Sequence, residues 1–381
     1  MFHYQTIKQM SNRQSVKQLK RWVIKVGSAL LTNDGLSLHT PYIRQLAAQI
    51  ACLNERDIEV VLVSSGSVAA GMGSLNMSSR PKAINELQAA AAVGQANLMQ
   101  CYQAVFEPHR INIAQVLLSH ADIADRERYL NARSTLTTLL ELDVLSVVNE
   151  NDTVATDEMC LGDNDRLAAL VVGLVDADLL VILTDQNGLY TADPRKDPTA
   201  ELVGEASADD SKLLLLASGG SSLGRGGMVT KIQAAQQASR SGVCTVIANG
   251  NHDQILIELS EGVEHGTWLQ AQQRLTSKKQ WMAGLTQIKG SLTIDTGAVQ
   301  KLKNSGSSLL PVGVVDVSGD FNRGELISCL DNTGKEIARG LSNYAAPEVE
   351  KISGRASTQI SEILGYPGDD ELIHRDNMVV F

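Results

Sequence analysis

The sequence predicts an α/β protein, a three-layer sandwich with a mainly parallel sheet, followed by a small C-terminal β-rich domain. Over residues 22–248, short apolar runs alternate six times with segments of helical spacing, which is typical of parallel strands joined by crossover helices. After about residue 270 the chain shows short β-like runs separated by Gly, Asp and Asn turns. Because 381 residues are too many for one compact core, two domains are expected.

Six apolar runs are predicted as buried strands because each is short, continuous and rich in Val, Leu and Ile. They cover residues 22–26, 58–63, 112–118, 143–148, 179–183 and 243–248. The segments between them place apolar residues at helical spacing, and Thr40 with Pro41 supplies a cap and a first-turn proline. The predicted helices cover residues 41–53, 82–107, 122–142, 167–175, 211–217 and 228–241.

The domain boundaries follow these changes of pattern. We predict a flexible extension over residues 1–19, a first domain over 20–270, a polar linker over 271–280 and a second domain over 281–381. A transit peptide is the alternative for the extension, but its arginines are few and its amphipathic pattern is poor. The second domain is predicted to contain strands at 291–295, 312–317 and 325–329, with short helices at 347–352 and 358–364.

Composition excludes several classes of protein. No stretch reaches 18 uninterrupted apolar residues, which argues against a membrane span. A net charge of −10 disfavours nonspecific nucleic-acid binding by the whole chain. The five cysteines are scattered without a CxxC pair, which favours reduced thiols in the cytoplasm over a disulfide framework or a zinc site.

Acidic and amide side chains gather where the fourth predicted strand ends and the next helix begins. Asn149 and Asp152 follow the strand, and Asp163, Asn164 and Asp165 open the helix. In open α/β sheets, ligands bind at the carboxyl ends of the strands. These groups could hold a metal, pair with an ammonium group or cap the helix, and capping explains only one or two of them.

Two other stretches supply positive charge and exposed backbone amides. Lys25 ends the first strand and is followed by Gly27, a weak signal for phosphate binding by itself. The run 224–231 is stronger, because three glycines precede a helix start whose first turn carries Lys231. A flexible surface loop is the alternative, and the run is not a Walker A motif.

Two further strand ends carry polar groups. Ser65 lies in a Ser-Ser-Gly-Ser run suited to a carboxylate or a phosphate, and Thr184 with Asp185 lies where a nucleotide base or ribose could bind. Turn chemistry alone would explain both. Together, the strand ends suggest phosphoryl transfer to an amino-acid-like substrate.

Several segments of the sequence resemble those of a known family. The segments VIKVGS (23–28), VSSGSVAAG (63–71), VVNENDTVATDE (147–158), GDNDRLAAL (162–170), LLVILTDQNGLYTADPR (179–195), GRGGMVTKIQAA (224–235) and ILGYPGDDELIHRDNMVV (363–380) are similar to those of the glutamate 5-kinases. The resemblance runs from Lys20 to the C-terminus. It implies an amino-acid kinase catalytic domain followed by a PUA domain, which is a small β-barrel-like domain.

The resemblance also implies a reaction, a set of ligands and a set of site residues. Enzymes of the family use Mg²⁺ and transfer the γ-phosphoryl group of ATP to the γ-carboxylate of L-glutamate. This reaction is the first step of proline synthesis, and proline usually inhibits the enzyme. Homo-oligomers, dimers or tetramers, are expected, with Mg²⁺ held mainly through ATP and no dedicated metal ligands. The implied catalytic residues are Lys25, Lys231 and Asp165. The implied glutamate-binding residues are Ser65, Asp152, Asn164, Asn149 and Asp163. The implied ATP-binding residues are Lys25, Gly27, Thr184, Asp185, Arg225, Gly226, Gly227, Met228, Val229, Thr230 and Lys231.

One position departs from the family pattern. Arg225 stands where the family usually has Thr, so we expect its side chain either to contact nucleotide phosphate or to point to solvent.

Two other functions remain as alternatives to a glutamate kinase. The nearest is another amino-acid kinase that acts on acetylglutamate or aspartate. RNA binding through the second domain is the other. From residue 275 onward there are 11 basic and 13 acidic residues, which is not the basic patch expected for RNA.

Overall fold

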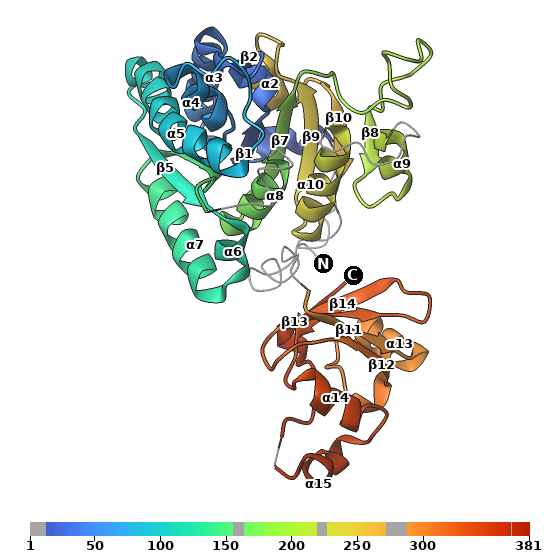
Figure 1. Ribbon diagram of the computed structural model, residues 1–381. Helices are drawn as coiled ribbons and strands as arrows, with labels where there is room; N and C mark the ends of the chain where they lie inside the picture. Colours follow the sequence, from blue (N-terminus) through green and yellow to red (C-terminus); the bar gives the residue numbers. More distant parts are fainter. Residues whose placement is uncertain (1–12, 155–163, 219–226, 272–287, 367) are drawn as a thin grey trace. The chain divides into compact units, whose positions relative to one another are not determined.

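The computed structural model divides the chain into two compact units, Met1–Arg274 and Leu275–Phe381 (Figure 1). The structure describes residues 13–154, 164–218, 227–271, 288–366 and 368–381. Each unit has a sheet and a hydrophobic core of its own. The residues expected to form the linker lie outside the described ranges, apart from Ala271.

The first unit is built on an eight-stranded sheet with the order β5-β6-β4-β1-β7-β9-β10-β8. Its strands are β1 (Arg21–Val26), β4 (Glu59–Val63), β5 (Ile113–Leu118), β6 (Leu145–Glu150), β7 (Leu179–Thr184), β8 (Glu205–Ser207), β9 (Cys244–Asn249) and β10 (Thr267–Gln270). The first six predicted strands pair in parallel, from β5 through to β9. The predicted mainly parallel α/β fold is therefore confirmed.

Helices cover both faces of this sheet (Figure 1). The helices of this unit are α2 (Ser28–Leu31), α3 (Thr40–Asn54), α4 (Ser67–Ser74), α5 (Ile84–Phe106), α6 (His120–Ala124), α7 (Arg126–Glu141), α8 (Asp165–Leu174), α9 (Lys212–Ser218), α10 (Met228–Arg240) and α11 (Ile255–Ser260), with the 3-10 turns η1 (Arg13–Gln18) and η2 (Glu107–His109) and the small hairpin β2 (Thr32–Asn33) and β3 (Ser37–Leu38). The larger core cluster joins α3, α5 and α11 to one face, whereas α8 and α10 pack together on the other.

Helices α4 and α5 cross at the two glycines Gly71 and Gly94. A Cβ atom placed on Gly94 would lie 1.8 Å from the carbonyl oxygen of Ser67, and one on Gly71 would lie 1.7 Å from that of Ala90. Since side chains cannot occupy that space, glycine is what permits this approach. The crossing holds the start of α4 against α5 and the adjoining end of β4.

The structure differs from the sequence predictions at several places. Residues 13–19, expected in a flexible extension, pack on the first unit, because Val16 and Leu19 are buried in its core and Arg13 donates to the carbonyl of Gly204 at 2.9 Å. The helix expected over 122–142 is two helices, because Asp125 leaves helical geometry and caps α7.

Short elements account for the remaining differences. Helices α2, α4 and α11 and strands β2, β3, β8 and β10 were not predicted, since each is too short to show a clear periodic pattern. Strand β10 pairs with β9 and runs antiparallel to it. Thr40 is the first residue of α3 rather than its cap, and Pro41 follows it in the first turn.

The second unit contains a five-stranded sheet with the order β12-β11-β13-β14-β15. Its elements are β11 (Gly290–Ile294), α13 (Thr296–Ser305), η4 (Pro311–Gly313), β12 (Val314–Gly319), β13 (Leu326–Leu330), β14 (Glu336–Leu341), α14 (Ala346–Ile352), η5 (Ser357–Gln359), α15 (Ile360–Leu364), η6 (Arg375–Asn377) and β15 (Met378–Val380). The three predicted strands are present. Sequence reasoning missed α13, β14 and β15; Asp295 caps α13 by accepting from the amide of Ala298 at 2.7 Å.

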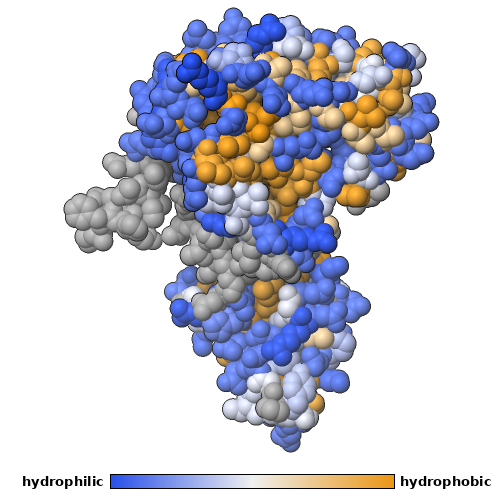
Figure 2. All heavy atoms as spheres, turned by 90° about the vertical axis from the view of Figure 1, so that its left-hand side faces the viewer, coloured by the Kyte–Doolittle hydropathy of each residue, from blue (hydrophilic) through white to orange (hydrophobic). Residues whose placement is uncertain are grey.

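Apolar side chains remain partly exposed along the edge strand β5. Ile113, Val116 and Leu117 are only half-buried, and Val93 of the neighbouring helix α5 is 40% exposed. Figure 2, which views the molecule from this side, shows apolar surface gathered on the first unit. None of the helices in the described ranges combines the length and apolar character needed to span a bilayer.

The α4–α5 crossing gives the first testable prediction. Gly94→Ala should lower the free energy of unfolding by about 1–3 kcal/mol, because the methyl group overlaps backbone atoms. This loss should appear even though alanine gains about 1 kcal/mol over glycine within a helix. Urea unfolding measures it. Gly204→Ala is the matched control, since nothing lies within 4 Å of its Cβ position. A Gly94→Ala protein as stable as the wild type would contradict the close packing.

Candidate active site

The described residues that the sequence singled out meet at the carboxyl ends of adjacent strands. Strands β6, β4, β1 and β7 are neighbours in the sheet, and they end near Asn149, Ser65, Lys25 and Thr184. Parallel pairing places these ends along one edge. Helices α8 and α10 begin close to this edge and contribute Asp165 and Lys231.

The centre of the site is a carboxylate shared by two ammonium groups. Asp165 Oδ1 lies 2.7 Å from the Nζ of Lys25, and its Oδ2 lies 3.0 Å from the Nζ of Lys231. The side chains of Lys25 and Asp165 are fully buried, and that of Lys231 is 7% exposed. Lys25 lies in β1, Asp165 in α8 and Lys231 in α10.

The alternation of side chains along β1 explains why a lysine is buried here. Trp22, Ile24 and Val26 belong to the core beneath α3, α5 and α11. Residues between them point to the opposite face, so Lys25 is directed toward α8 and α10. A charge on that face requires a partner of opposite sign, and Asp165 provides it.

The three side chains of this group carry two positive charges and one negative charge. Burying ions is costly, and one carboxylate in contact with two ammonium groups offsets part of the cost for all three. Two ammonium groups held together favour an anion that enters the site. Two lysines held in fixed positions are a suitable arrangement for phosphoryl oxygens.

The first turn of α10 also contacts the carboxylate of Asp165. Thr230 Oγ1 lies 2.8 Å from Asp165 Oδ2 and also 2.8 Å from the carbonyl oxygen of Gly227, and its single proton is donated to one of them at a time. Gly227 has φ 90°, a backbone conformation that favours glycine. Met228 and Val229 complete this first turn, where backbone amides point out of the helix end.

A cavity of about 360 Å³ includes Asn164, the residue that precedes Asp165 in the chain, in its lining. Most of its lining residues have polar side chains, and they come mainly from the ends of β4 and β6, the start of α4, helix α2 and the β2–β3 region. The lining residues are Ser28, Ala29, Thr32, Asp34, Gly35, Ser65, Gly66, Ser67, Val68, Ala69, Arg80, Asn149, Asp152 and Asn164. This volume and the mixture of acid, amide, hydroxyl and one guanidinium suit a small zwitterionic molecule.

Two asparagines and a glutamine form a chain of hydrogen bonds at the cavity wall. The side-chain amide of Asn164 donates to the carbonyl of Ser64 and to Asn149 Oδ1, each at 2.6 Å. Asn149 in turn donates to Gln95 Oε1 at 2.8 Å. Asn164 precedes α8 but makes no side-chain capping bond, so the alternative that it serves only as a helix cap is wrong.

Ser65 and Ser67 differ although both line the cavity. Ser67 Oγ donates to Asp152 Oδ2 at 2.8 Å and so orients that carboxylate. The buried Ser65 hydroxyl has no hydrogen-bond partner among the described residues. An unpaired buried hydroxyl costs free energy, which indicates a group held ready for a ligand.

The ends of β1 and β7 lie together, because these strands pair in parallel. The amide of Gly27 donates to the carbonyl of Leu183 at 3.1 Å, and the amide of Gly250 donates to that of Thr184 at 2.8 Å. Thr184 is buried and its hydroxyl donates to the exposed Asp185 at 3.1 Å. This second cluster is separate from the cavity wall described above.

Some predicted site residues lie outside the described ranges, and others were missed. Asp163, Arg225 and Gly226 are not described. Sequence reasoning missed Arg80, Asp34 and Gln95 among the residues at or behind the cavity wall. The Ser-Ser-Gly-Ser run already indicated the place of Ser67, but no local pattern marks Arg80, which reaches the cavity from the loop between α4 and α5.

Comparison with known families agrees with this architecture. The model of the Amino acid kinase family matches residues 20–249, and that of the PUA domain matches residues 290–364. The chain therefore belongs to the amino acid kinase family and carries a PUA domain.

Relatives of nearly full length define the branch of the family. Glutamate 5-kinase from Nitrosospira multiformis is 55% identical over 367 residues, which cover 96% of this chain and 99% of that protein. The enzyme of the same name from Burkholderia cenocepacia is 56% identical over 370 residues, covering 97% and 100%. These relatives place the chain, an enzyme, among the glutamate 5-kinases. A solved UMP kinase from Bacillus anthracis covers 68% of this chain and 98% of its own, with 14% identity and a TM-score of 0.47, so the assignment depends on the sequence relatives.

The unpaired hydroxyl leads to a second prediction. Ser65→Ala should leave the free energy of unfolding unchanged or raise it by about 1 kcal/mol, because it removes a buried group without a partner. Ser67→Ala, two residues away, should lower it by about 1 kcal/mol through the lost bond to Asp152. Urea unfolding of both variants measures the contrast. Equal destabilisation by the two substitutions would show that Ser65 is a structural residue.

Proposed function

We propose that this enzyme transfers the γ-phosphoryl group of ATP to the γ-carboxylate of L-glutamate, giving glutamyl 5-phosphate as the first step of proline biosynthesis. Proline is the proposed feedback inhibitor. Relatives of nearly full length that are named glutamate 5-kinase support glutamate as the substrate. The scattered cysteines, of which Cys52, Cys101, Cys244 and Cys329 are free thiols, support a cytoplasmic location.

One observation carries the proposal: consecutive residues face the two halves of the reaction. Asn164 lines the cavity, and Asp165 holds the two lysines. A molecule in the cavity therefore lies next to a site that attracts phosphoryl oxygens. This adjacency is what a carboxylate acceptor and a phosphoryl donor need.

Phosphoryl transfer to a carboxylate demands positioning and charge neutralisation rather than a base. The γ-carboxylate of glutamate is ionised at neutral pH, so its oxygen can form the new bond to phosphorus as the bond to ADP breaks. We propose that the ammonium groups of Lys25 and Lys231 offset the charge on the transferring group. Asp165 fixes where those ammonium groups lie.

The cavity wall supplies complementary groups for the amino acid. We propose that Asp152 pairs with its ammonium group, whereas Ser65, Asn149 and Asn164 bind its carboxylates. Asp163 completes this proposed set. Asn149 and Asn164 are already oriented by their hydrogen bonds, so little ordering is needed on binding.

The proposed nucleotide site uses the second cluster and the start of α10. Thr184 and Asp185 would contact the nucleoside, and Lys25, Gly27 and the stretch 225–231 would surround its phosphates. Mg²⁺, when bound, supplies charge neutralisation across those phosphates. Asp165 already contacts both lysines, so we propose that Mg²⁺ is held mainly through ATP oxygens.

Self-association is part of the proposal. The half-buried apolar residues of β5 favour coverage by a second copy, and we propose a dimer or a tetramer. Sedimentation analysis at micromolar concentration that gave only monomers would contradict it.

A substrate screen tests the proposed reaction. The purified enzyme with ATP and Mg²⁺ should form an acyl phosphate, trapped with hydroxylamine, from L-glutamate at a rate at least tenfold above that from acetylglutamate or aspartate. Added proline should lower the rate with glutamate. Preference for another acceptor would overturn the proposed substrate while leaving the kinase family unchanged.

The role of the second lysine is tested by Lys231→Ala. We expect kcat to fall by about 10²–10³-fold, because the lost charge acts on the transferring group. The KM for ATP should change far less. Lys212→Ala, which removes an exposed lysine at the start of α9, is the control. An unchanged kcat would remove Lys231 from the proposed mechanism.

A further inference from the structure

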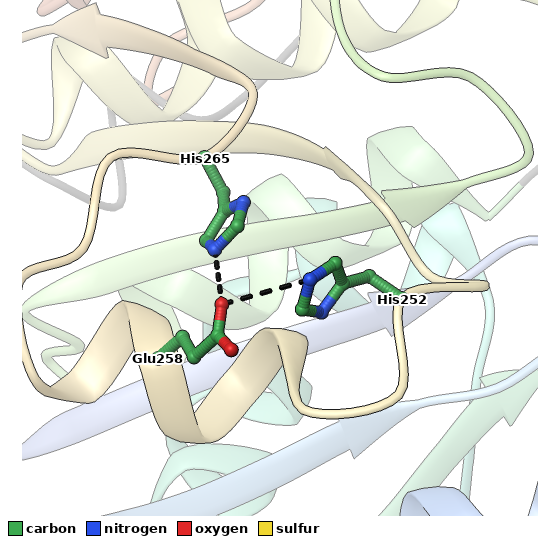
Figure 3. Close-up of side chains that lie close together, drawn as sticks. All are labelled: His252, Glu258 and His265. Atoms are coloured by element: carbon green, nitrogen blue, oxygen red, sulfur yellow. Dashed lines mark hydrogen bonds and ion pairs between the residues drawn. The ribbon is translucent and has the colours of Figure 1, made fainter.

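A histidine–carboxylate–histidine cluster lies in the first unit, outside the proposed active site. His252 follows β9, Glu258 lies in α11, and His265 precedes β10. Figure 3 shows both imidazole rings directed at the carboxylate of Glu258, which contacts His265 Nε2 and lies 3.6 Å from His252 Nε2. One ligand atom from each residue lies within 4.8 Å of the others.

The backbone around these side chains is held by buried contacts. Helix α11 is anchored through Ile255, Leu256 and Leu259, all buried in the core. The amide of Leu256 also donates to Gln49 Oε1 at 2.9 Å. Near His265, the guanidinium of Arg13 donates to the carbonyls of His265 and Gly266. The backbone that carries the three side chains is therefore held in place by buried contacts.

We propose that His252, Glu258 and His265 form a binding site for a divalent transition metal ion, with Zn²⁺ as the ion of reference. Two imidazoles and one carboxylate are a known zinc ligand set, with water at the fourth position. Bonds of about 2.0–2.2 Å in a tetrahedron separate ligand atoms by roughly 3.3–3.6 Å. The distance of 3.6 Å between His252 and Glu258 matches that requirement.

Binding requires small and definite changes. The contact between His265 Nε2 and Glu258 must open so that both atoms can bind one ion, and any proton between them is released to solvent. His252 must bind through Nε2 with its proton on Nδ1, so the hydrogen bond that the amide of Gln254 donates to Nδ1 at 3.3 Å is lost. The side chains have room to adjust, since those of His252, Glu258 and His265 are 42%, 28% and 24% exposed.

A bound ion would join three segments at one side of the sheet. The turn after β9, helix α11 and the start of β10 would share one centre, and the same turn is bonded through Gly250 to Thr184 at the end of β7. Because only the folded chain presents the three ligands together, binding should raise its stability. This inference does not depend on the proposed function.

Metal titration of the full-length enzyme tests the site. Chelator-treated protein without nucleotide should bind one equivalent of Zn²⁺ in competition with a chromophoric chelator, and the ion should raise Tm. Co²⁺ should give visible absorption of a tetrahedral site without a thiolate charge-transfer band. His252→Gln should weaken Zn²⁺ binding at least tenfold, and His252→Gln with His265→Gln should abolish it.

The controls separate a metal site from a structural cluster. His252→Gln is expected to fold, since His252 is the most exposed member and takes no part in the contact between His265 and Glu258. His109→Gln removes an exposed histidine elsewhere and should leave binding unchanged. Zn²⁺ uptake that is absent in the wild type, unchanged in the double variant, or accompanied by a cobalt–thiolate band would overturn the proposal.

Discussion

The buried pairing of Lys25 and Lys231 with Asp165 is the interaction on which the rest of the site depends. Two ammonium groups can remain at the end of a buried strand only if a negative charge lies between them. Asp165 meets that need from the first turn of α8, with oxygens 2.7 and 3.0 Å from the two nitrogens. The arrangement keeps two ammonium groups buried at fixed positions near the ends of the strands.

Three features of the fold hold this arrangement in place. Pairing of β1 with β4 and β7 sets the direction of Lys25, and the packing of α8 against α10 brings Asp165 to Lys231. The glycine crossing of α4 and α5 supports the opposite wall of the cavity, where Ser67 orients Asp152. The catalytic unit thus builds its polar site from groups whose backbones are fixed by an apolar core.

The sequence predicted the sheet well because buried parallel strands are continuous apolar runs, and the six predicted strands lie within about two residues of β1, β4, β5, β6, β7 and β9. Motif resemblance indicated Lys25, Lys231 and Asp165 as one group. Spacing alone could not, because their contacts join residues far apart in the chain. Arg80 and the cluster around Glu258 were missed for the same reason. The burial of residues 13–19 also depends on tertiary contacts, since their local sequence is polar and basic.

The most direct test of the account is the kinetics of Asp165→Asn, which keeps the shape of the side chain and removes its charge. Without the carboxylate, the two ammonium groups repel each other and lose their fixed positions. The account predicts a fall in kcat of at least about 100-fold with a KM for glutamate changed by less than about tenfold. A variant that folds and retains kcat near the wild-type value would contradict the central role of this carboxylate.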